Sequence, residues 1–151
     1  MMLQRMLAVA AFLCLSGAAA CGGEKSAGPG PTVSGNYRAT EWVTTGGTEQ
    51  TNQLNAGSLL SMALASDGTT TGHLHVAASG GNPAFDADMA GTWSMSNSEV
   101  TFSQAADTFV RDLTFTLVPS GSVWALTADQ VVNGTRIQLT LTQLILVALS
   151  R

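Results

Sequence analysis

The chain has 151 residues, of which 45% are hydrophobic and 11% charged, and its net charge is −4 at pH 7. Only six side chains are lysine or arginine, and they are scattered along the sequence. Composition therefore fits one globular domain and argues against nucleic-acid binding, because a phosphate backbone requires clustered basic side chains.

The first 20 residues have the layout of an export signal. Arg5 precedes an apolar run from Met6 to Leu15, and small residues follow as far as Ala20. A retained membrane helix needs about 20 apolar residues, and this run is shorter. We therefore expect residues 1–20 to be a signal peptide that is removed.

The residues "AAAC" at positions 18–21 resemble the lipobox of bacterial lipoproteins. The resemblance implies that Cys21 is the lipid attachment site and the first residue of the mature chain, which it binds to a membrane. By the sorting rule of that family, Gly22 after the cysteine implies the outer membrane in a host with two membranes. The alternative is an ordinary secretory signal followed by an incidental cysteine.

Residues 21–32 are expected to form the lipidated cysteine and a flexible linker. The stretch "GGEKSAGPGPT" that follows Cys21 is rich in glycine and proline and has no periodic apolar residues. The remaining residues, 33–151, are long enough for one folded domain. Because Cys14 and Cys21 are the only cysteines, this domain has no thiol and no disulfide.

The domain alternates between apolar and polar side chains, which is typical of half-buried β-strands. Turn sequences such as Asp67-Gly68 and Asn133-Gly134 separate the alternating runs and favour antiparallel hairpins. The pattern predicts eight strands, near residues 33–43, 58–65, 70–78, 84–96, 99–104, 112–118, 122–132 and 135–147.

An even number of up-and-down strands allows the last strand to pair with the first, which removes the exposed edges of the sheet. We therefore predict an all-β fold, an eight-stranded antiparallel up-and-down β-barrel, with a β-sandwich as the alternative. Between Tyr37 and Trp42 the alternation changes phase at Glu41, which predicts a bend or bulge in the first strand.

The sequence Gly35-Asn36-Tyr37 at the start of the first strand resembles the opening of lipocalin-like domains, and Gly91-Thr92-Trp93 repeats the pattern. The resemblance implies a cup-shaped barrel in which the long loop at 44–57 forms a flap over the mouth. It is a resemblance of fold, and fold alone does not determine function.

If the parity is right, one face of each strand lines the barrel. Arg38 and Arg136 have the opposite parity, so a bound ligand is expected to be small, apolar and uncharged. The alternative is a barrel filled by its own side chains. The candidate lining residues are Tyr37, Met62, Leu64, Met89, Trp93, Phe115, Leu117 and Leu139.

Two pairs of titratable residues could carry chemistry. His73 and His75 share one face of a strand and are weak candidates for a metal site, and Asp86 and Asp88 share a face that we expect to be solvated. The sequence contains no catalytic or nucleotide-binding motif. We therefore expect no enzyme activity and no cofactor.

These features predict a lipid-anchored protein of the cell envelope that binds a small hydrophobic ligand in its barrel. The alternative is a structural or interaction module that contacts another envelope protein. The apolar tail at 144–151 is expected either to extend the last strand or to cover one end of the barrel.

Overall fold

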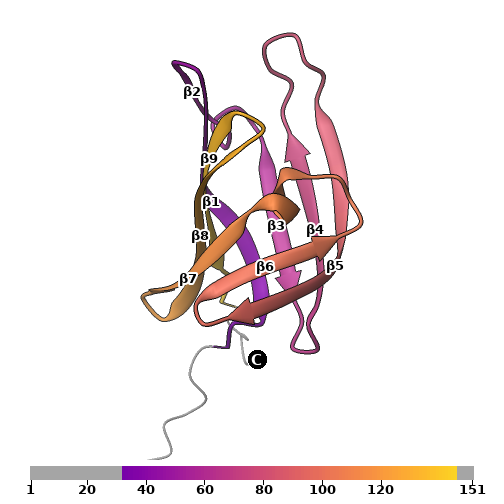
Figure 1. Ribbon diagram of the computed structural model, residues 1–151, viewed down its shortest axis with the longest axis vertical. Helices are drawn as coiled ribbons and strands as arrows, with labels where there is room; N and C mark the ends of the chain where they lie inside the picture. The colour runs from indigo at the N-terminus through magenta and orange to yellow at the C-terminus, as the bar shows by residue number, and fades with distance from the viewer. Residues whose placement is uncertain (1–31, 146–151) are drawn as a thin grey trace, which may run out of the picture.

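The computed structural model describes residues 32–145, which form a closed antiparallel β-barrel (Figure 1). The predicted signal peptide, the lipid attachment at Cys21, the linker up to residue 31 and the tail at 146–151 lie outside the described residues. The strands are β1 (Gly35–Gly46), β2 (Glu49–Asn52), β3 (Leu59–Leu64), β4 (Thr69–Val76), β5 (Phe85–Ser96), β6 (Glu99–Gln104), β7 (Thr114–Ser120), β8 (Val123–Val132) and β9 (Thr135–Gln143), with one short 3-10 helix, η1 (Phe109–Asp112), between β6 and β7.

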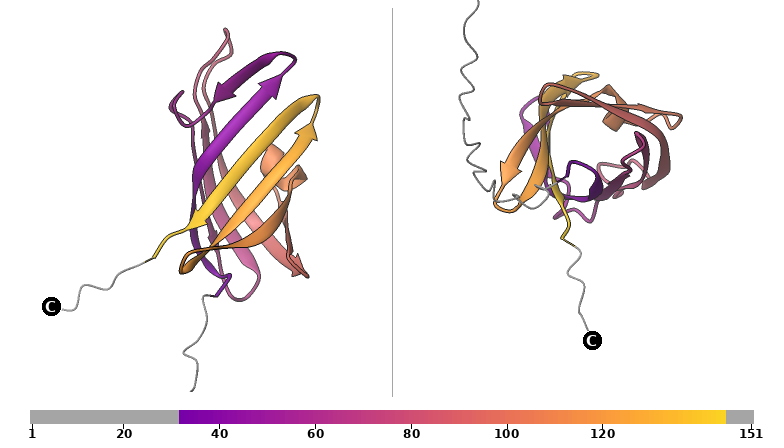
Figure 2. Two further views of the ribbon diagram at one scale, coloured as in Figure 1. Left: turned by 90° about the vertical axis from the view of Figure 1, so that its left-hand side faces the viewer. Right: turned by 90° about the horizontal axis from the view of Figure 1, so that it is seen from below.

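The ring closes because the first strand of the domain pairs with the last. β1 pairs with β9 from Tyr37 opposite Gln143 to Gly46 opposite Thr135, and with β3 over its first residues, from Gly35 opposite Leu64 to Arg38 opposite Ser61. Figure 2 shows β1 and β9 side by side in one view and the closed ring in the other. The predicted eight-stranded barrel is confirmed, with the short β2 as an additional strand, and the β-sandwich alternative is wrong.

Two predicted boundaries need correction. The segment 44–57 is not one long loop, because β1 continues to Gly46 and β2 pairs back onto it from Glu49 to Asn52. A tight turn joins the two strands, and Gly47 adopts a positive φ of 60° within it. The last strand ends at Gln143, whereas the sequence pattern extended it to residue 147.

β1 contains the irregularity that its sequence predicts. The register with β9 shifts between Ala39 and Glu41, so that Thr40 is an extra residue with no residue opposite it on β9. The bulge restores the inward direction for Trp42, which is 1% exposed, while Glu41 is exposed on the outer wall.

The barrel interior is packed with side chains from all of its strands. Of the eight candidate lining residues, six are buried, and Trp93 and Leu117 are partly buried against the same core. The buried six are Tyr37, Met62, Leu64, Met89, Phe115 and Leu139. Trp42, Leu60, Leu74 and Leu126 fill more of the interior.

Tyr37 is the only tyrosine, so its titration can be observed directly. Its hydroxyl donates a hydrogen bond of 2.6 Å to the Val33 carbonyl, and burial raises its pKa from 10.0 to about 12. We expect stability to be constant below pH 10 with respect to this group and to fall between pH 10 and 12, because only the unfolded chain ionises there. Near-ultraviolet absorbance of tyrosinate measures the pKa, and a midpoint near 10 in the folded protein would contradict the prediction.

Candidate binding sites on the barrel

The two ends of the barrel differ. Both ends of the described chain, together with the hairpin turns β3–β4, β5–β6 and β7–β8, lie at the lower end in Figure 2, and the β1–β2 and β8–β9 hairpins lie at the upper end. The up-and-down order also places the β4–β5 connection and the segment containing η1 at the upper end. We call this upper end the open end. It carries the longer connections, which are where barrels of this size bind ligands.

A pocket of about 330 Å³ lies at the open end, between the β1–β2 hairpin and the β4–β5 connection. Its lining is mainly hydroxyl and amide groups, with Glu49 as the only charged side chain. The lining residues are Thr44, Gly46, Glu49, Thr51, Gln53, Val76, Ala77, Ser79, Gly80, Asn82, Pro83 and Thr135.

A chain of hydrogen bonds fixes the floor of this pocket. The Ala77 backbone N–H donates to Ser58 Oγ at 3.0 Å, and the Ser58 hydroxyl donates to Gln53 Oε1 at 3.1 Å. Gln53 Nε2 in turn donates to Thr44 Oγ1 at 2.7 Å. Ser58 is fully buried, so the polar residues at this end are held in a defined arrangement before any ligand binds.

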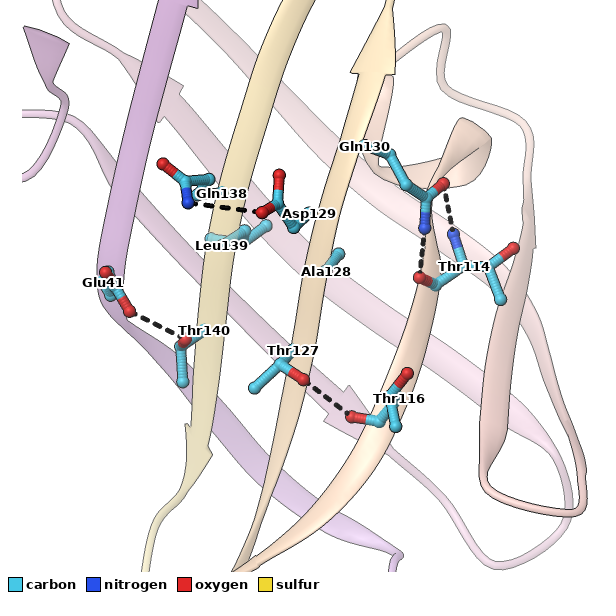
Figure 3. Close-up of a pocket in the computed structure, with 10 residues that line it drawn as sticks. All are labelled: Glu41, Thr114, Thr116, Thr127, Ala128, Asp129, Gln130, Gln138, Leu139 and Thr140. Carbon is cyan, nitrogen blue, oxygen red and sulfur yellow. Dashed lines mark hydrogen bonds between the residues drawn. The ribbon is translucent and has the colours of Figure 1, made fainter. Parts of the chain in front are cut away.

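A second, larger groove of about 490 Å³ lies on the outer wall across β1, β9, β8 and β7 (Figure 3). Strands β7 and β8 pair only as far as Thr116 opposite Thr127, and beyond that point the Gln130 side chain bonds to the backbone of Thr114 (Figure 3). The side-chain amide of Gln130 thus takes the place of a backbone hydrogen-bonded pair between β7 and β8. The groove residues are Glu41, Thr114, Thr116, Thr127, Ala128, Asp129, Gln130, Gln138, Leu139 and Thr140.

The groove contains two carboxylates with different surroundings. Asp129 is held by the Arg136 guanidinium in two hydrogen bonds of 2.7 and 2.6 Å, which lower the pKa of Asp129 and raise that of Arg136. Glu41 accepts a hydrogen bond of 3.2 Å from the Thr140 hydroxyl and forms no salt bridge within residues 32–145. Glu41 therefore gives the groove its uncompensated negative charge.

The two histidines lie on the outer wall, opposite the two aspartates of β5. His73 Nδ1 is 2.9 Å from Asp88 Oδ1, and His75 Nδ1 is 2.8 Å from Asp86 Oδ1. The side chains of His73 and Asp88 are 50% and 94% exposed, so this cluster is a solvated cross-strand ladder. Among the residues that the structure describes, no group of three or more potential ligands is arranged to hold a metal ion.

Comparison of the chain with protein-family models, curated proteins and solved structures gives no match. The likeness to lipocalin-like domains and to bacterial lipoproteins therefore remains a prediction from short motifs. Within residues 32–145, no helix has the length and apolar character needed to span a membrane.

Two polar side chains inside the barrel were not predicted from the sequence. Trp42 Nε1 and both amide atoms of Gln104 are buried and make no hydrogen bond to any described residue. The strand pattern offered a signal for Gln104, because it shares the parity of the buried Val100 and Phe102 on β6. The interior is therefore not uniformly apolar, whereas the alternation of the strand residues had predicted an apolar lining.

Proposed function

We propose that this protein is a lipid-anchored binding protein of the cell envelope, placed in the outer membrane, which takes up a small uncharged molecule at the open end of its barrel. The support for the anchor is the "AAAC" motif and the glycine-rich linker. The support for binding in place of catalysis is that the only two histidines of the sequence pair with aspartates on the exposed outer wall, and neither lines the open-end pocket.

One observation carries the proposal: the open end lies opposite the point where the chain enters the barrel. β1 begins at the lower end, so a tether from Cys21 reaches the domain there (Figure 2). A linker of about 11 residues spans on the order of 18 Å as a flexible coil, which keeps the domain close to the membrane surface. The open-end pocket then faces away from the membrane and is accessible to a diffusing ligand.

The packing of the interior determines where an apolar ligand could be held. Trp42, Tyr37 and Phe115 each expose 1% or less of their surface, and they occupy the space that a lipid chain would need. The open-end pocket has hydroxyl and amide groups ready to bond. We therefore place the ligand at this end and expect it to be neutral, with polar groups, in place of the purely apolar ligand that the sequence pattern favoured.

The anchor is tested by replacing its cysteine. Cys21→Ser removes the lipid attachment site, so it is expected to abolish incorporation of radiolabelled palmitate. Because stable anchoring needs the acyl chains, the protein is then expected to move from the membrane fraction to the soluble fraction. Cys14→Ser is the matched control, since it removes the only other cysteine. If Cys21→Ser remains acylated and bound to the membrane, the lipoprotein assignment is wrong.

Ligand binding is tested on the intact lipoprotein extracted from membranes. Native mass spectrometry is expected to find a small-molecule adduct that survives in Thr101→Trp, on the outer wall, and disappears in Asn82→Trp, which fills the open-end pocket. An adduct retained equally in both variants, or no adduct in the unmodified protein, would exclude the open end as the binding site.

The outer-wall groove favours a second candidate function, contact with another envelope protein. It is larger than the open-end pocket and presents the Glu41 carboxylate without a cationic partner among the described residues. A photo-crosslinking residue at Gln138 in intact cells would then give one specific protein adduct, which the same residue at the exposed Ser103 on β6 would not give. Equal labelling from both positions would count against this function.

A further inference from the structure

The chain enters and leaves the barrel at one place on its lower end. Gln143, the last residue of β9, donates from its side-chain Nε2 to the Thr32 carbonyl at 2.7 Å and to the Ser34 carbonyl at 3.0 Å. The Leu144 backbone N–H donates to the Asn36 carbonyl at 2.7 Å. The first and last described residues of the chain are therefore held side by side at the lower end (Figure 2).

The residues that follow β9 are apolar without interruption. Leu144 and Ile145 are 50% and 60% exposed, so the barrel leaves half or more of each side chain uncovered. The sequence continues as Leu-Val-Ala-Leu to position 149, and we call residues 144–149 the apolar tail. Single exposed apolar side chains are common on protein surfaces, whereas a contiguous group of them marks a surface that contacts a partner or a membrane.

The direction of β9 carries the apolar tail off the lower end of the barrel. The bond from Leu144 to Asn36 extends the antiparallel pairing of β9 with β1 by one residue, and β1 begins at Gly35. A groove of about 400 Å³ on the outer wall across β1, β3 and β4 has Leu144 among its lining residues. The chain would have to reverse its direction to enter that groove, so the lower end is favoured over the wall.

The lower end also carries fewer charged side chains than the open end. In and next to its hairpin turns, the described residues place Asp67 and Glu99, and Met95 there is 46% exposed. Burying a charge in an apolar layer is costly, so the end with fewer charges approaches lipid more easily. The charged residues of the connections and hairpins at the open end are Glu49, Asp86, Asp107, Arg111, Asp112 and Arg136.

The apolar tail is too short to cross a membrane. A spanning helix needs about 20 apolar residues, and only long helices and closed barrels satisfy their backbone hydrogen bonds inside the hydrocarbon core. A shorter apolar segment can place its side chains in the interfacial layer, where water still reaches the backbone. Arg151, two positions after the tail, has a side chain that can reach the phosphate groups of lipids while its stem stays among apolar groups.

We propose that the apolar tail inserts into the interface of the membrane that holds Cys21 and acts as a second, non-covalent anchor. This inference deepens the proposed function and rests on its lipid anchor. The linker keeps the lower end within about 18 Å of the membrane on average, and residues 145–149 reach about 13 Å further when extended. Two attachments at one end hold the barrel in one orientation, with the open-end pocket pointing away from the membrane.

Fluorescence quenching locates the tail in the intact lipoprotein, reconstituted into phosphatidylcholine vesicles. Val147→Cys is labelled with the dye NBD, and Asn82→Cys at the open-end pocket is the matched control. The unsubstituted protein is the blank, because an acylated Cys21 does not react with the dye. Doxyl-labelled lipid is expected to quench the dye at position 147 and not at position 82, and aqueous iodide is expected to do the reverse.

Two results of this experiment would overturn the inference. Strong quenching by iodide at position 147 would place the tail in water. Protection of position 147 from both quenchers would place the tail against protein, either in the groove that Leu144 lines or on a partner.

The strength of the contact is measured after the tether is cut. A protease site built into the linker allows the barrel to be separated from its acyl chains on the vesicles. Ile145→Ser is expected to weaken retention of the cut protein about tenfold, which corresponds to roughly 1.4 kcal/mol. Val131→Ser is the matched control, because Val131 is 67% exposed at the open end, and its retention is expected to be unchanged. Full retention of Ile145→Ser, or an equal loss in both variants, would contradict the second anchor.

The two anchors can fail separately. If Cys21 takes up no palmitate while Ile145→Ser still weakens binding of the protein to vesicles, the lipid tether is wrong and the second anchor stands. If palmitate is incorporated and the dye at position 147 stays in water, the tether stands and the second anchor is wrong.

Discussion

Gly91→Ala is expected to destabilise the barrel by about 3 kcal/mol or more, the upper range for overpacking, even though the substitution adds one methyl group. A Cβ atom at this position would collide with the carbonyl oxygen of Ser103 and lie 2.9 Å from the Cα atom of Gln104. Both contacts are with the backbone of β6, which cannot rotate aside as a side chain can. Relief would require β5 and β6 to separate, and this would break their ladder where Gly91 pairs with Gln104.

Gly46→Ala is the matched control for this prediction. Its added Cβ would have no atom within 4 Å, and the residue has no left-handed backbone conformation. Urea denaturation followed by tryptophan fluorescence measures both variants. We expect the Gly46→Ala midpoint to stay close to that of the unmodified protein and the Gly91→Ala midpoint to fall sharply; equal midpoints would show that β6 yields more easily than its contacts indicate.

Phe115→Ala is expected to cost about 3–5 kcal/mol, as other large-to-small substitutions of buried phenylalanine do. Phe115 is 0% exposed, and its ring meets the Phe102 ring edge to face, with centroids 5.5 Å apart and an interplanar angle of 80°. Its removal leaves a cavity in the middle of the barrel. The neighbouring side chains come from several strands of a closed ring, so they cannot collapse freely to fill it.

Phe85→Ala is the matched control, because it removes the same side chain from a strand position with the inward parity. Phe85 is 48% exposed, so its loss is expected to change the free energy of unfolding by about 1 kcal/mol or less. Thermal and urea unfolding of the two variants give the comparison. A similar loss in both would mean that burial in the barrel does not determine the contribution of these rings.

The contrast between these two phenylalanines shows the limit of reading a strand by its alternation. Phe85, Met89 and Met95 share one face of β5, yet only Met89 is buried. Alternation predicts the direction in which a side chain points. Its burial also depends on whether that part of the strand is surrounded by other strands. β5 is longer than the barrel core, so its two ends carry inward-pointing residues beyond the packed interior.

The candidate sites were less predictable than the fold for a related reason. The pocket at the open end joins residues of the β1–β2 hairpin to Asn82 and Pro83 of the β4–β5 connection, which are distant in the sequence. Gln104 could be assigned to the interior by parity, but its lack of a hydrogen-bond partner depends on every other side chain that surrounds it in the barrel. No local pattern reports that kind of information.

The sequence by itself determined eight of the nine strands, most of the turns between them and the bulge in β1, because each depends on neighbouring residues: alternation within a strand, glycine or asparagine at a positive φ, and a phase change at Glu41. Only the tertiary structure decided the register in which β1 closes onto β9, that β2 folds back onto β1, and that Gly91 lies against the backbone of β6. The physical reason is that these contacts join residues separated by long stretches of chain, so their geometry is set by the tilt and closure of the whole ring.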